Sequence, residues 1–465
     1  MKNKKSKQEF LGTVGVISLG CSKNRINTEQ MMFLLHEAGY FVTGEISDVD
    51  IVLLNTCGFI KSAKDEAVET ILELVEEKKQ GKIGKLIVAG CFPQRYKKHI
   101  MEDLPDIDAV VGTGSFNDIV NVIKNQGDGS SAFFDDINAP VSETPRIIST
   151  SPVWAYLKIA EGCDNRCAFC CIPDIRGNFR SRPIENIISE AKKLAEKGIL
   201  ELILVAQDLT RYGLDLYGEK KLTGLLTSLS EIEGLKWIRL HYLYPDEFDD
   251  ELIEIISKSD KILKYLDIPI QHINDDILKK MNRRGTGQDI RTLFKRIREK
   301  IPEVVLRTSL ITGLPGEGEK EYKELCKFLK EAKIERVGVF AYSPEEGTAA
   351  ALMERPTKEI AEKRADDLNN LQQQIMQKWN ETRIGTVTDV IIEDIITNYD
   401  GTSYLTARSF AESPEIDGYI LVKNHGDDSQ DAPGSTPVIT EDMMWTLSPC
   451  LITGIENGEL VGEPT

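Results

Sequence analysis

One stretch of the sequence decides how the chain is interpreted: EGCDNRCAFCCIP, residues 161–173. Three of its cysteines, Cys163, Cys167 and Cys170, are spaced C-x3-C-x2-C and follow an apolar run typical of a buried strand. Three thiolates in one short loop can bind three irons of a cubane iron–sulfur cluster. The fourth iron then has no protein ligand, so the loop predicts a cluster with one open position.

An open iron suits S-adenosylmethionine, which binds it through amino and carboxylate groups before an electron from the cluster cleaves a carbon–sulfur bond. We therefore predict a catalytic role for these three cysteines. Zinc is the main alternative, but it normally takes four ligands, and no fourth Cys or nearby His has suitable spacing. Ordinary core thiols are the other alternative. Cys171 adjoins Cys170 and is expected to point elsewhere.

Six apolar runs around and after this loop alternate with helical patterns, which predicts βα units and a parallel sheet. The expected strands are residues 155–159, 201–206, 237–241, 265–269, 304–312 and 336–342. Six units fit a partial (β/α) barrel better than a complete eightfold one. A polar helix at 360–382 is expected to connect to the next domain, so the predicted catalytic core is residues 149–382.

The first third of the chain shows the same alternation, and the fold class is therefore α/β. The expected strands are residues 13–19, 50–55, 85–89 and 109–112, with helical patterns at 29–38 and 64–79. Such a pattern predicts a Rossmann-like parallel sheet over residues 12–126. Residues 127–151 are rich in Gly, Ser, Asp and Pro and are expected to form a linker.

A second set of cysteines lies in this N-terminal sheet. Cys21, Cys57 and Cys91 each follow a predicted strand. The loops at the carboxyl ends of parallel strands gather at one edge of the sheet, so these three thiols are expected to share a metal site. A single buried Cys would be an ordinary core residue. That bland interpretation is preferred for Cys326 and Cys450.

The last part of the chain changes to short β runs at residues 387–392, 403–407, 419–422 and 450–454. They predict a small antiparallel β-barrel within residues 383–465. Residues 425–442 have low-complexity character and are expected to form a mobile loop.

The charge of this last domain is strongly negative. The whole chain has a net charge of −18, and residues 381–465 hold sixteen Asp or Glu against three Lys or Arg. Such a domain repels phosphates and attracts a basic partner, so a nucleic-acid partner is not expected. The alternative is an acidic surface that only keeps the protein in solution.

The carboxyl ends of barrel strands are where cofactor-binding residues collect. Gln207 and Asp208 offer hydrogen bonds there, and the turn GLPGE places Gly313, Gly316 and Glu317 after a later strand. The two glycines can allow close approach of an adenosyl group, or they can simply form a turn.

Three arginines, Arg176, Arg180 and Arg182, follow the first cysteine loop. They are placed either to hold a carboxylate or to form a solvated basic face. His272, at another strand end, is interpreted as structural.

The chain shows no signal peptide and no apolar stretch long enough to span a membrane. Nine cysteines, an odd number, argue against a disulfide framework. We expect a cytoplasmic monomer without a membrane partner.

The sequence resembles the methylthiotransferase family over about residues 12–465. The resemblance rests on SLGCSKNRINTEQM, NTCGFI, YLKIAEGCDNRCAFCCIPDIRGNFRSRP, LVAQDLTRYGLDLYG, DIPIQHINDDILKKMNRRGT and SFAESPEIDG. The family has an N-terminal methylthiotransferase domain, a radical S-adenosylmethionine core and a C-terminal TRAM barrel. The start SLGCSKN is similar to the branch that modifies a ribosomal protein, whereas the tRNA-modifying branch would show a YGCQMN-like start.

The resemblance implies two 4Fe-4S clusters and S-adenosylmethionine as cofactors. Cys163, Cys167 and Cys170 would bind the radical-generating cluster, and Cys21, Cys57 and Cys91 an auxiliary cluster that delivers sulfur. The substrate would be an aspartate of small-subunit ribosomal protein S-twelve, a basic protein, which gains a methylthio group on its β-carbon. A flavodoxin- or ferredoxin-type protein would be the reductant. The alternative is a tRNA methylthiotransferase acting on an adenosine beside the anticodon.

Two features depart from the family pattern. Cys171 stands where a non-ligand residue is expected. The loop at residues 426–442 is longer than usual and weakens residue-level mapping of the TRAM barrel.

Overall fold

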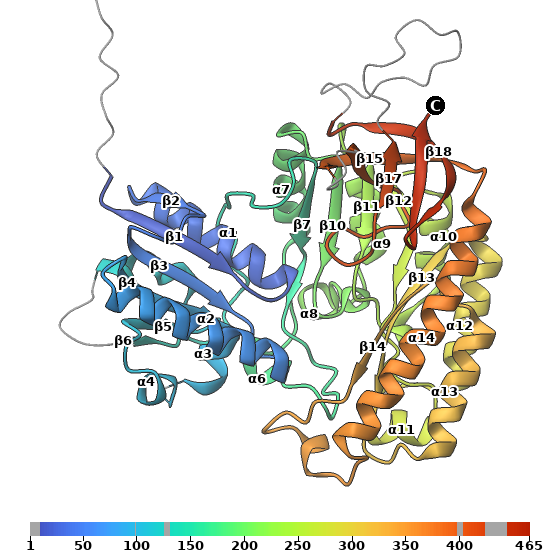
Figure 1. The fold of residues 1–465 in the computed structure, drawn as a ribbon, viewed down its shortest axis with the longest axis horizontal. Coiled ribbons are helices and arrows are strands. Elements are labelled where there is room, and N and C mark those ends of the chain that lie inside the picture. Colours follow the sequence, from blue (N-terminus) through green and yellow to red (C-terminus); the bar gives the residue numbers. More distant parts are fainter. Residues whose placement is uncertain (1–9, 98, 125–130, 398–402, 424–443) are drawn as a thin grey trace, which may run out of the picture.

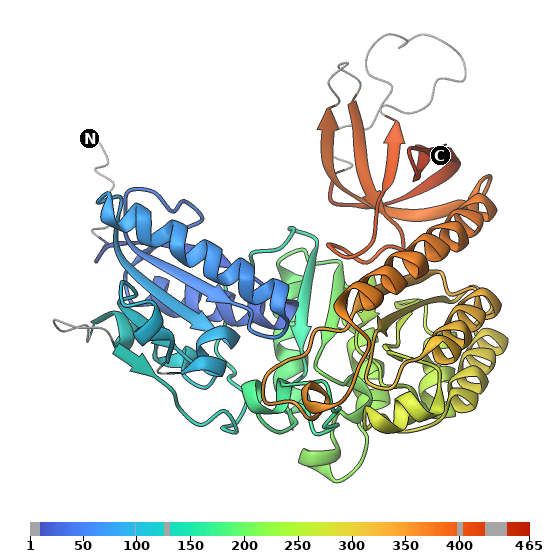
Figure 2. The same cartoon turned by 60° about the horizontal axis from the view of Figure 1, so that its bottom comes forward.

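The computed structural model describes residues 10–97, 99–124, 131–397, 403–423 and 444–465. The chain forms an N-terminal α/β body, a central α/β body and a C-terminal barrel (Figure 1). Figure 2 shows the barrel joined to the central body by one long helix, α14 (Lys358–Arg383). No helix among the described residues is long and apolar enough to cross a membrane.

The N-terminal body is built on a six-stranded sheet in which every pairing is parallel. In spatial order its strands are β2 (Phe41–Thr43), β1 (Thr13–Ser18), β3 (Val49–Thr56), β4 (Ile83–Gly90), β5 (Ala109–Val111) and β6 (Ser131–Phe133). Its helices are α1 (Ser22–Glu37), α2 (Lys61–Lys79), α3 (Cys91–Tyr96), α4 (His99–Asp103) and α5 (Ile119–Lys124). The predicted parallel sheet is confirmed, with two short edge strands added.

One of those edge strands lies in the segment expected to be a linker. Ser131–Phe133 pairs with β5, so part of residues 127–151 belongs to the sheet. Three residues are too few to give a readable alternation, which is why sequence pattern missed both edge strands.

The central body is a second six-stranded parallel sheet, as predicted for a partial barrel. In spatial order its strands are β14 (Arg336–Ala341), β13 (Val305–Thr312), β12 (Ile262–Asp267), β11 (Trp237–Leu240), β10 (Glu201–Val205) and β7 (Trp154–Lys158). Its helices are α7 (Ile184–Glu196), α8 (Leu214–Tyr217), α9 (Leu222–Ser230), α10 (Asp250–Lys258), α11 (Asp275–Lys280), α12 (Gly287–Lys300) and α13 (Glu319–Ala332). A two-stranded ribbon of β8 (Ala160–Glu161) and β9 (Arg180–Ser181) brackets α6 (Ile172–Arg176).

Helix α14 does more than connect two domains. Its buried Ala361, Ala365 and Leu368 face the central body, and Gln372 donates hydrogen bonds to the backbone oxygens of Ile334 and Glu335. These few apolar side chains are widely spaced in a mostly polar helix. The composition of α14 therefore predicted a connecting helix and did not reveal its packing on the central body. The helix covers the edge of the sheet at β14 before it enters the barrel.

The C-terminal domain is a closed five-stranded barrel. Its strands are β15 (Val387–Thr397), β16 (Ser403–Arg408), β17 (Ile420–Lys423), β18 (Leu447–Glu456) and β19 (Glu459–Pro464). Four described pairings are antiparallel, as predicted, and the pairing of β17 with β19 is parallel. Cys450 is buried in the barrel core, as expected. The predicted mobile loop at 425–442 lies outside the described residues.

The loop Ser409–Asp417 between β16 and β17 leaves the barrel and packs on the sheet face of the central body opposite its helices. The Tyr265 hydroxyl donates to Asp417 Oδ2 at 2.7 Å, and Arg239 Nη1 donates to the Phe410 backbone oxygen at 2.8 Å. His241 Nε2 lies 2.9 Å from Ser413 Oγ. This C-terminal loop therefore covers part of the inner face of the partial barrel.

Buried ion pairs fasten this contact. Glu412, which is 1% exposed, receives Arg336 at 2.8 Å and Arg383 at 2.5 Å. Burial alone would raise the pKa of Glu412, but the two guanidinium groups outweigh it and lower the pKa to about 2. Glu201 is shared in the same way by Arg239 and Arg408.

We predict that Glu412→Gln destabilises the protein by about 3 kcal/mol at pH 7, because two buried arginines lose their counter-charge. The pKa of this carboxyl is depressed in the folded state, so its contribution is present above about pH 4.5 and is lost as the pH falls toward 2. Urea unfolding of the cluster-free proteins should show a difference in the free energy of unfolding between wild type and Glu412→Gln, and this difference should shrink as the pH falls below 4.5.

Glu456→Gln is the matched control. Glu456 pairs with Lys423 at 3.0 Å on the barrel surface, so its loss should change stability by no more than about 0.5 kcal/mol. Equal effects of the two variants would contradict the buried ion-pair assignment.

Candidate functional site

The first cysteine set lies on the loop between β8 and α6, at the carboxyl end of the central sheet. The Cys163 amide donates to the Gly177 backbone oxygen at 3.1 Å, and the Ile172 amide donates to Cys170 Sγ at 3.5 Å. The Ala168 amide donates to the Met281 oxygen at 2.9 Å. The loop is thereby tied to both of its own ends and to α11.

An arginine and a tyrosine that the sequence analysis did not single out contact this loop. Arg283 Nη1 lies 3.7 Å from Cys167 Sγ, and Tyr244 Oη lies 3.8 Å from the same sulfur. The guanidinium also sits 4.1 Å from the centre of the Tyr244 ring. Arg283 lies within the quoted stretch DIPIQHINDDILKKMNRRGT, which was the available sequence signal.

The strand-end loops that carry the second cysteine set lie next to one another. A Cβ on Gly20 would lie 2.8 Å from Cys57 Cβ, and a Cβ on Gly58 would lie 2.8 Å from the Cys91 backbone. Burial, followed by the neighbouring Cys91 and Cys21 sulfurs, raises the pKa of the Cys57 thiol to about 12. The glycines let three strand-end loops approach closely enough for their thiols to influence one another.

The two cysteine loops also lie next to each other. Helix α3 begins at Cys91 and packs on α6, which begins directly after Cys171. Cys91, Cys171 and Ile175 form one buried cluster, against which Phe59 packs. Sequence patterns placed each set within its own sheet, but they carried no information on how the two sheets dock.

A second contact holds the two bodies together beside these loops. Glu345, in the loop after β14, is 2% exposed and receives Lys64 at 2.5 Å and Arg95 at 2.7 Å from the N-terminal body. Arg95 also donates to the Gly58 backbone oxygen at 2.9 Å, next to Cys57.

Arg176 joins the cysteine sets. It is 3% exposed, and its Nη2 lies 3.2 Å from Cys91 Sγ. Its Nη1 donates to Glu161 Oε2 at 3.1 Å and to Asn27 Oδ1 at 3.0 Å. Burial alone would raise the pKa of Glu161, but the charges of Arg176 and Lys158 hold that pKa below its usual range. The alternative of a solvated basic face is therefore wrong for Arg176.

The other two arginines have different partners. Arg182 pairs with Glu143 at 2.5 Å and with Glu190 at 2.8 Å. Arg180 donates to the backbone oxygens of Arg176 and Asn178. Both stabilise the chain around the first cysteine loop.

Gln207 and Asp208 lie beside the first cysteine loop. Asp208 Oδ2 accepts from Asn165 Nδ2 at 2.8 Å, and its other oxygen accepts from Thr210, so it holds the loop. Gln207 Nε2 donates to Glu161 at 2.8 Å, while its buried Oε1 has no hydrogen-bond partner among the described residues. The amide oxygen of Gln207 is thus available to a bound group, and direct cofactor contact by either residue stays a prediction.

The GLPGE turn has structural contacts of its own. Glu317 is buried, pairs with Arg364 of α14 at 2.7 Å and accepts from the Gly313 amide at 3.0 Å. A Cβ on Gly313 would lie 2.3 Å from Ala361 Cβ, so this glycine is required for helix packing. His272 lies 3.4 Å from Glu317, in keeping with a structural role. Cofactor contact by Gly313, Gly316 and Glu317 stays a prediction.

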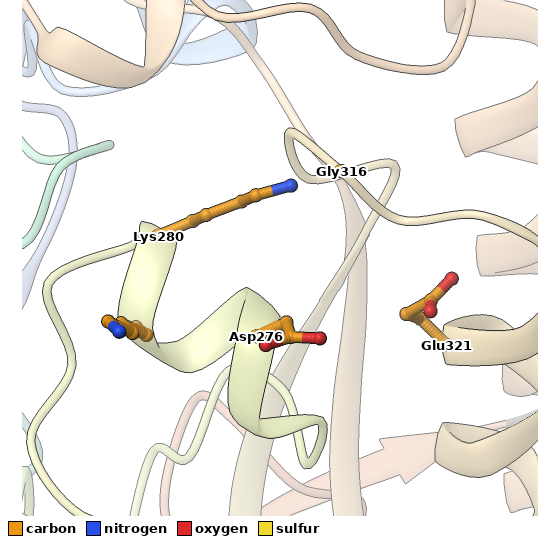
Figure 3. A pocket seen from close by; sticks show the side chains of 5 residues that line it. Asp276, Lys280, Gly316 and Glu321 are labelled. Atoms are coloured by element: carbon orange, nitrogen blue, oxygen red, sulfur yellow. The ribbon is translucent and has the colours of Figure 1, made fainter.

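An open cavity of about 620 Å³ lies between α11 and this turn. Figure 3 shows the Lys280 side chain extended toward Gly316, with Asp276 and Glu321 on the other sides. Its lining combines both signs of charge, and none of the six cysteines contributes to it.

Three family models match the chain in the order of its three bodies. They are the uncharacterized protein family UPF0004 at residues 13–112, the Radical SAM superfamily at 157–329 and the TRAM domain at 384–464. A solved structure with a similar fold is a radical S-adenosylmethionine methyltransferase from Kitasatospora setae, with cobalamin and a 4Fe-4S cluster bound. Its TM-score is 0.53 at 14% identity, over 71% of this chain and 73% of that one. The protein is therefore a radical S-adenosylmethionine enzyme, and its cofactors are S-adenosylmethionine and iron–sulfur.

Curated relatives narrow the class. A ribosomal protein uS12 methylthiotransferase RimO of Acetivibrio thermocellus is 47% identical, over 88% of this chain and 91% of that protein. The RimO of Clostridioides difficile is 44% identical, over 88% of this chain and 92% of that protein. The chain belongs to the RimO family of methylthiotransferases, as the resemblance implied.

Among the described residues, neither cysteine set has the arrangement that a single metal ion requires. Across the described ranges, no three His, Cys, Asp or Glu side chains are close enough to surround one metal ion. Each thiolate of a cubane binds a different iron, so cluster ligands are spread more widely than the ligands of zinc.

We predict that Cys171→Ala leaves the iron content of the reconstituted protein unchanged, whereas Cys170→Ala lowers it. The Cys171 thiol lies 3.7 Å from the Phe59 backbone oxygen and packs against Ile175 in the hydrophobic cluster between the two bodies. We therefore expect it to stabilise the contact between the N-terminal and central bodies. Iron per chain and the visible absorbance of the two variants provide the measurement. Loss of iron in Cys171→Ala alone would reverse the ligand assignment.

Proposed function

We propose that the protein adds a methylthio group to the β-carbon of an aspartate in ribosomal protein uS12. The proposal rests on membership of the RimO family, whose curated members carry uS12 methylthiotransferase as their name. A flavodoxin- or ferredoxin-type protein would supply electrons, and the chain would act as a monomer.

The surface of the C-terminal barrel supports a basic protein substrate. Residues 381–465 contain three basic side chains. Arg408 is buried against Glu201 of the central body, and Arg383 is partly buried and paired with Glu412 of the C-terminal loop. The third, Lys423, is paired with Glu456. The acidic residues at Asp389 and Asp394 stay exposed. This arrangement opposes binding to RNA phosphates and favours encounter with a basic partner.

The two cysteine sets would each hold a 4Fe-4S cluster. Cys163, Cys167 and Cys170 would bind the first, and Cys21, Cys57 and Cys91 the second. When bound, the groups would supply a 5′-deoxyadenosyl radical from S-adenosylmethionine at the first site and an activated sulfur at the second. Each set would leave one iron position without a protein ligand.

The protein's own residues provide position and exclusion of water. Asn165, Asp208 and Arg283 fix the first loop, and the packing of α3 on α6 brings the second site close to it. A primary radical is lost when it diffuses away or takes a hydrogen atom from the wrong donor. Transfer of sulfur to the substrate radical therefore requires, above all, that the two sites lie close together. The buried contact of Cys91, Cys171 and Ile175 supplies that proximity.

We predict that Ala at 163, 167 and 170 abolishes cleavage of S-adenosylmethionine, because no cluster remains to donate the electron. Ala at 21, 57 and 91 should spare cleavage and stop sulfur insertion. Chromatographic assay of 5′-deoxyadenosine and mass spectrometry of uS12 measure the two steps separately. Loss of cleavage in both triple variants would mean that the second set is mainly structural.

The tRNA-modifying alternative is tested on the substrate itself. In a strain that lacks the gene, uS12 should lose the mass of one methylthio group, while the adenosine beside the anticodon keeps its modification. The opposite pattern would replace this proposal with the tRNA activity.

A further inference from the structure

Arg176 is a buried charged side chain that contacts both cysteine-bearing segments. It ends α6, which follows the first loop, and its guanidinium lies in the second site, 3.2 Å from Cys91 Sγ. Nη2 also donates to Asn24 Oδ1, and that oxygen accepts from the Cys91 thiol at 3.4 Å. Asn24 in turn donates to the Thr56 backbone oxygen at 2.8 Å, next to Cys57.

The charge of this group is not cancelled by its neighbours. Glu161 pairs with Arg176 at 3.1 Å and with Lys158 at 2.9 Å, so the three side chains carry a net charge of one positive unit. Lys158 and Arg176 are each 3% exposed and Glu161 is 8% exposed. Water screens a charge poorly at such depth, and the member that touches sulfur is the cation.

We propose that Arg176 sets the reduction potential of the auxiliary cluster, as a positioning residue that acts through the Cys91 sulfur. This inference rests on the proposed function, which places a cluster on Cys21, Cys57 and Cys91. Hydrogen bonds and positive charge at the ligand sulfurs stabilise the more electron-rich state of an iron–sulfur cluster and raise its potential.

The position of Arg176 also links this effect to the first site. Glu161 precedes Cys163 by two residues, and it accepts from Gln207 Nε2 at 2.8 Å. The Gln207 oxygen that remains has no partner among the described residues and lies beside the first loop. Arg176 is therefore connected to the first site through Glu161 and Gln207.

The test uses the full chain with Ala at 163, 167 and 170, so that the auxiliary cluster is the only one with a paramagnetic signal. A redox titration followed by electron paramagnetic resonance compares this background with and without Arg176→Gln. Loss of the positive charge should shift the potential to more negative values. The expected size is about a tenfold drop in the equilibrium constant for one-electron reduction, or ~59 mV.

Two further variants separate charge from packing. Arg176→Lys keeps the positive charge but loses the forked contact of the guanidinium. The potential of the auxiliary cluster in this variant should therefore fall between those of the background and of Arg176→Gln. Arg180→Gln removes a nearby arginine whose hydrogen bonds to described residues go to backbone oxygens, with no contact to a cysteine sulfur, and it should leave the potential unchanged. If Arg176→Gln takes up no iron, Arg176→Met, which also removes the charge, takes its place, and a cluster potential equal to that of the background overturns the proposal.

Failure of the inference and failure of the proposed function give different results. If the background protein with intact Cys21, Cys57 and Cys91 binds no cluster, the auxiliary site itself is wrong. If it binds a cluster whose potential stays the same when the Arg176→Gln substitution is added, Arg176 is only structural and the inference alone fails.

Discussion

The fold depends most on the buried ion pair between Glu161 and Arg176. These two residues bracket the loop that carries Cys163, Cys167 and Cys170, and the guanidinium reaches across to the loop of Cys91. A buried pair is strongly destabilising when one partner is lost, so neither loop can shift independently. The contact between the two cysteine loops thus depends on sixteen consecutive residues, Glu161 to Arg176, together with the docking of α3 on α6.

Two further groups of buried ion pairs hold the N-terminal and C-terminal parts of the chain against the central body. Glu345 ties the loop after β14 to Lys64 and Arg95, and Glu412 ties the C-terminal loop to Arg336 and Arg383. Both are carboxylates shared by two cations, at opposite sides of the central body. Such three-membered groups fix orientation better than single pairs, because the carboxylate cannot turn toward one cation without leaving the other.

The sequence predicted the elements well and their docking poorly. Long parallel strands such as β3 and β4 contain continuous apolar runs, so hydrophobic pattern located them. Cys21, Cys57 and Cys91 could be grouped because parallel strands share one carboxyl edge. Arg176 could not be placed, since an arginine in a polar stretch has the same appearance whether it faces water or a buried thiol. The three-residue strands β2 and β6 were missed because they exist through pairing with longer neighbours.

The loop Ser409–Asp417 has a consequence for how this architecture can change. Its residues line the inner face of the central sheet through Tyr265, Arg239 and His241, so the C-terminal barrel forms part of the wall of the catalytic body. A recognition domain attached by a plain linker can be exchanged freely between enzymes. Here a new barrel would have to bring a matching loop with it. Substrate range and catalytic interior are therefore expected to evolve together, and chimeras cut at α14 alone would leave the interior open.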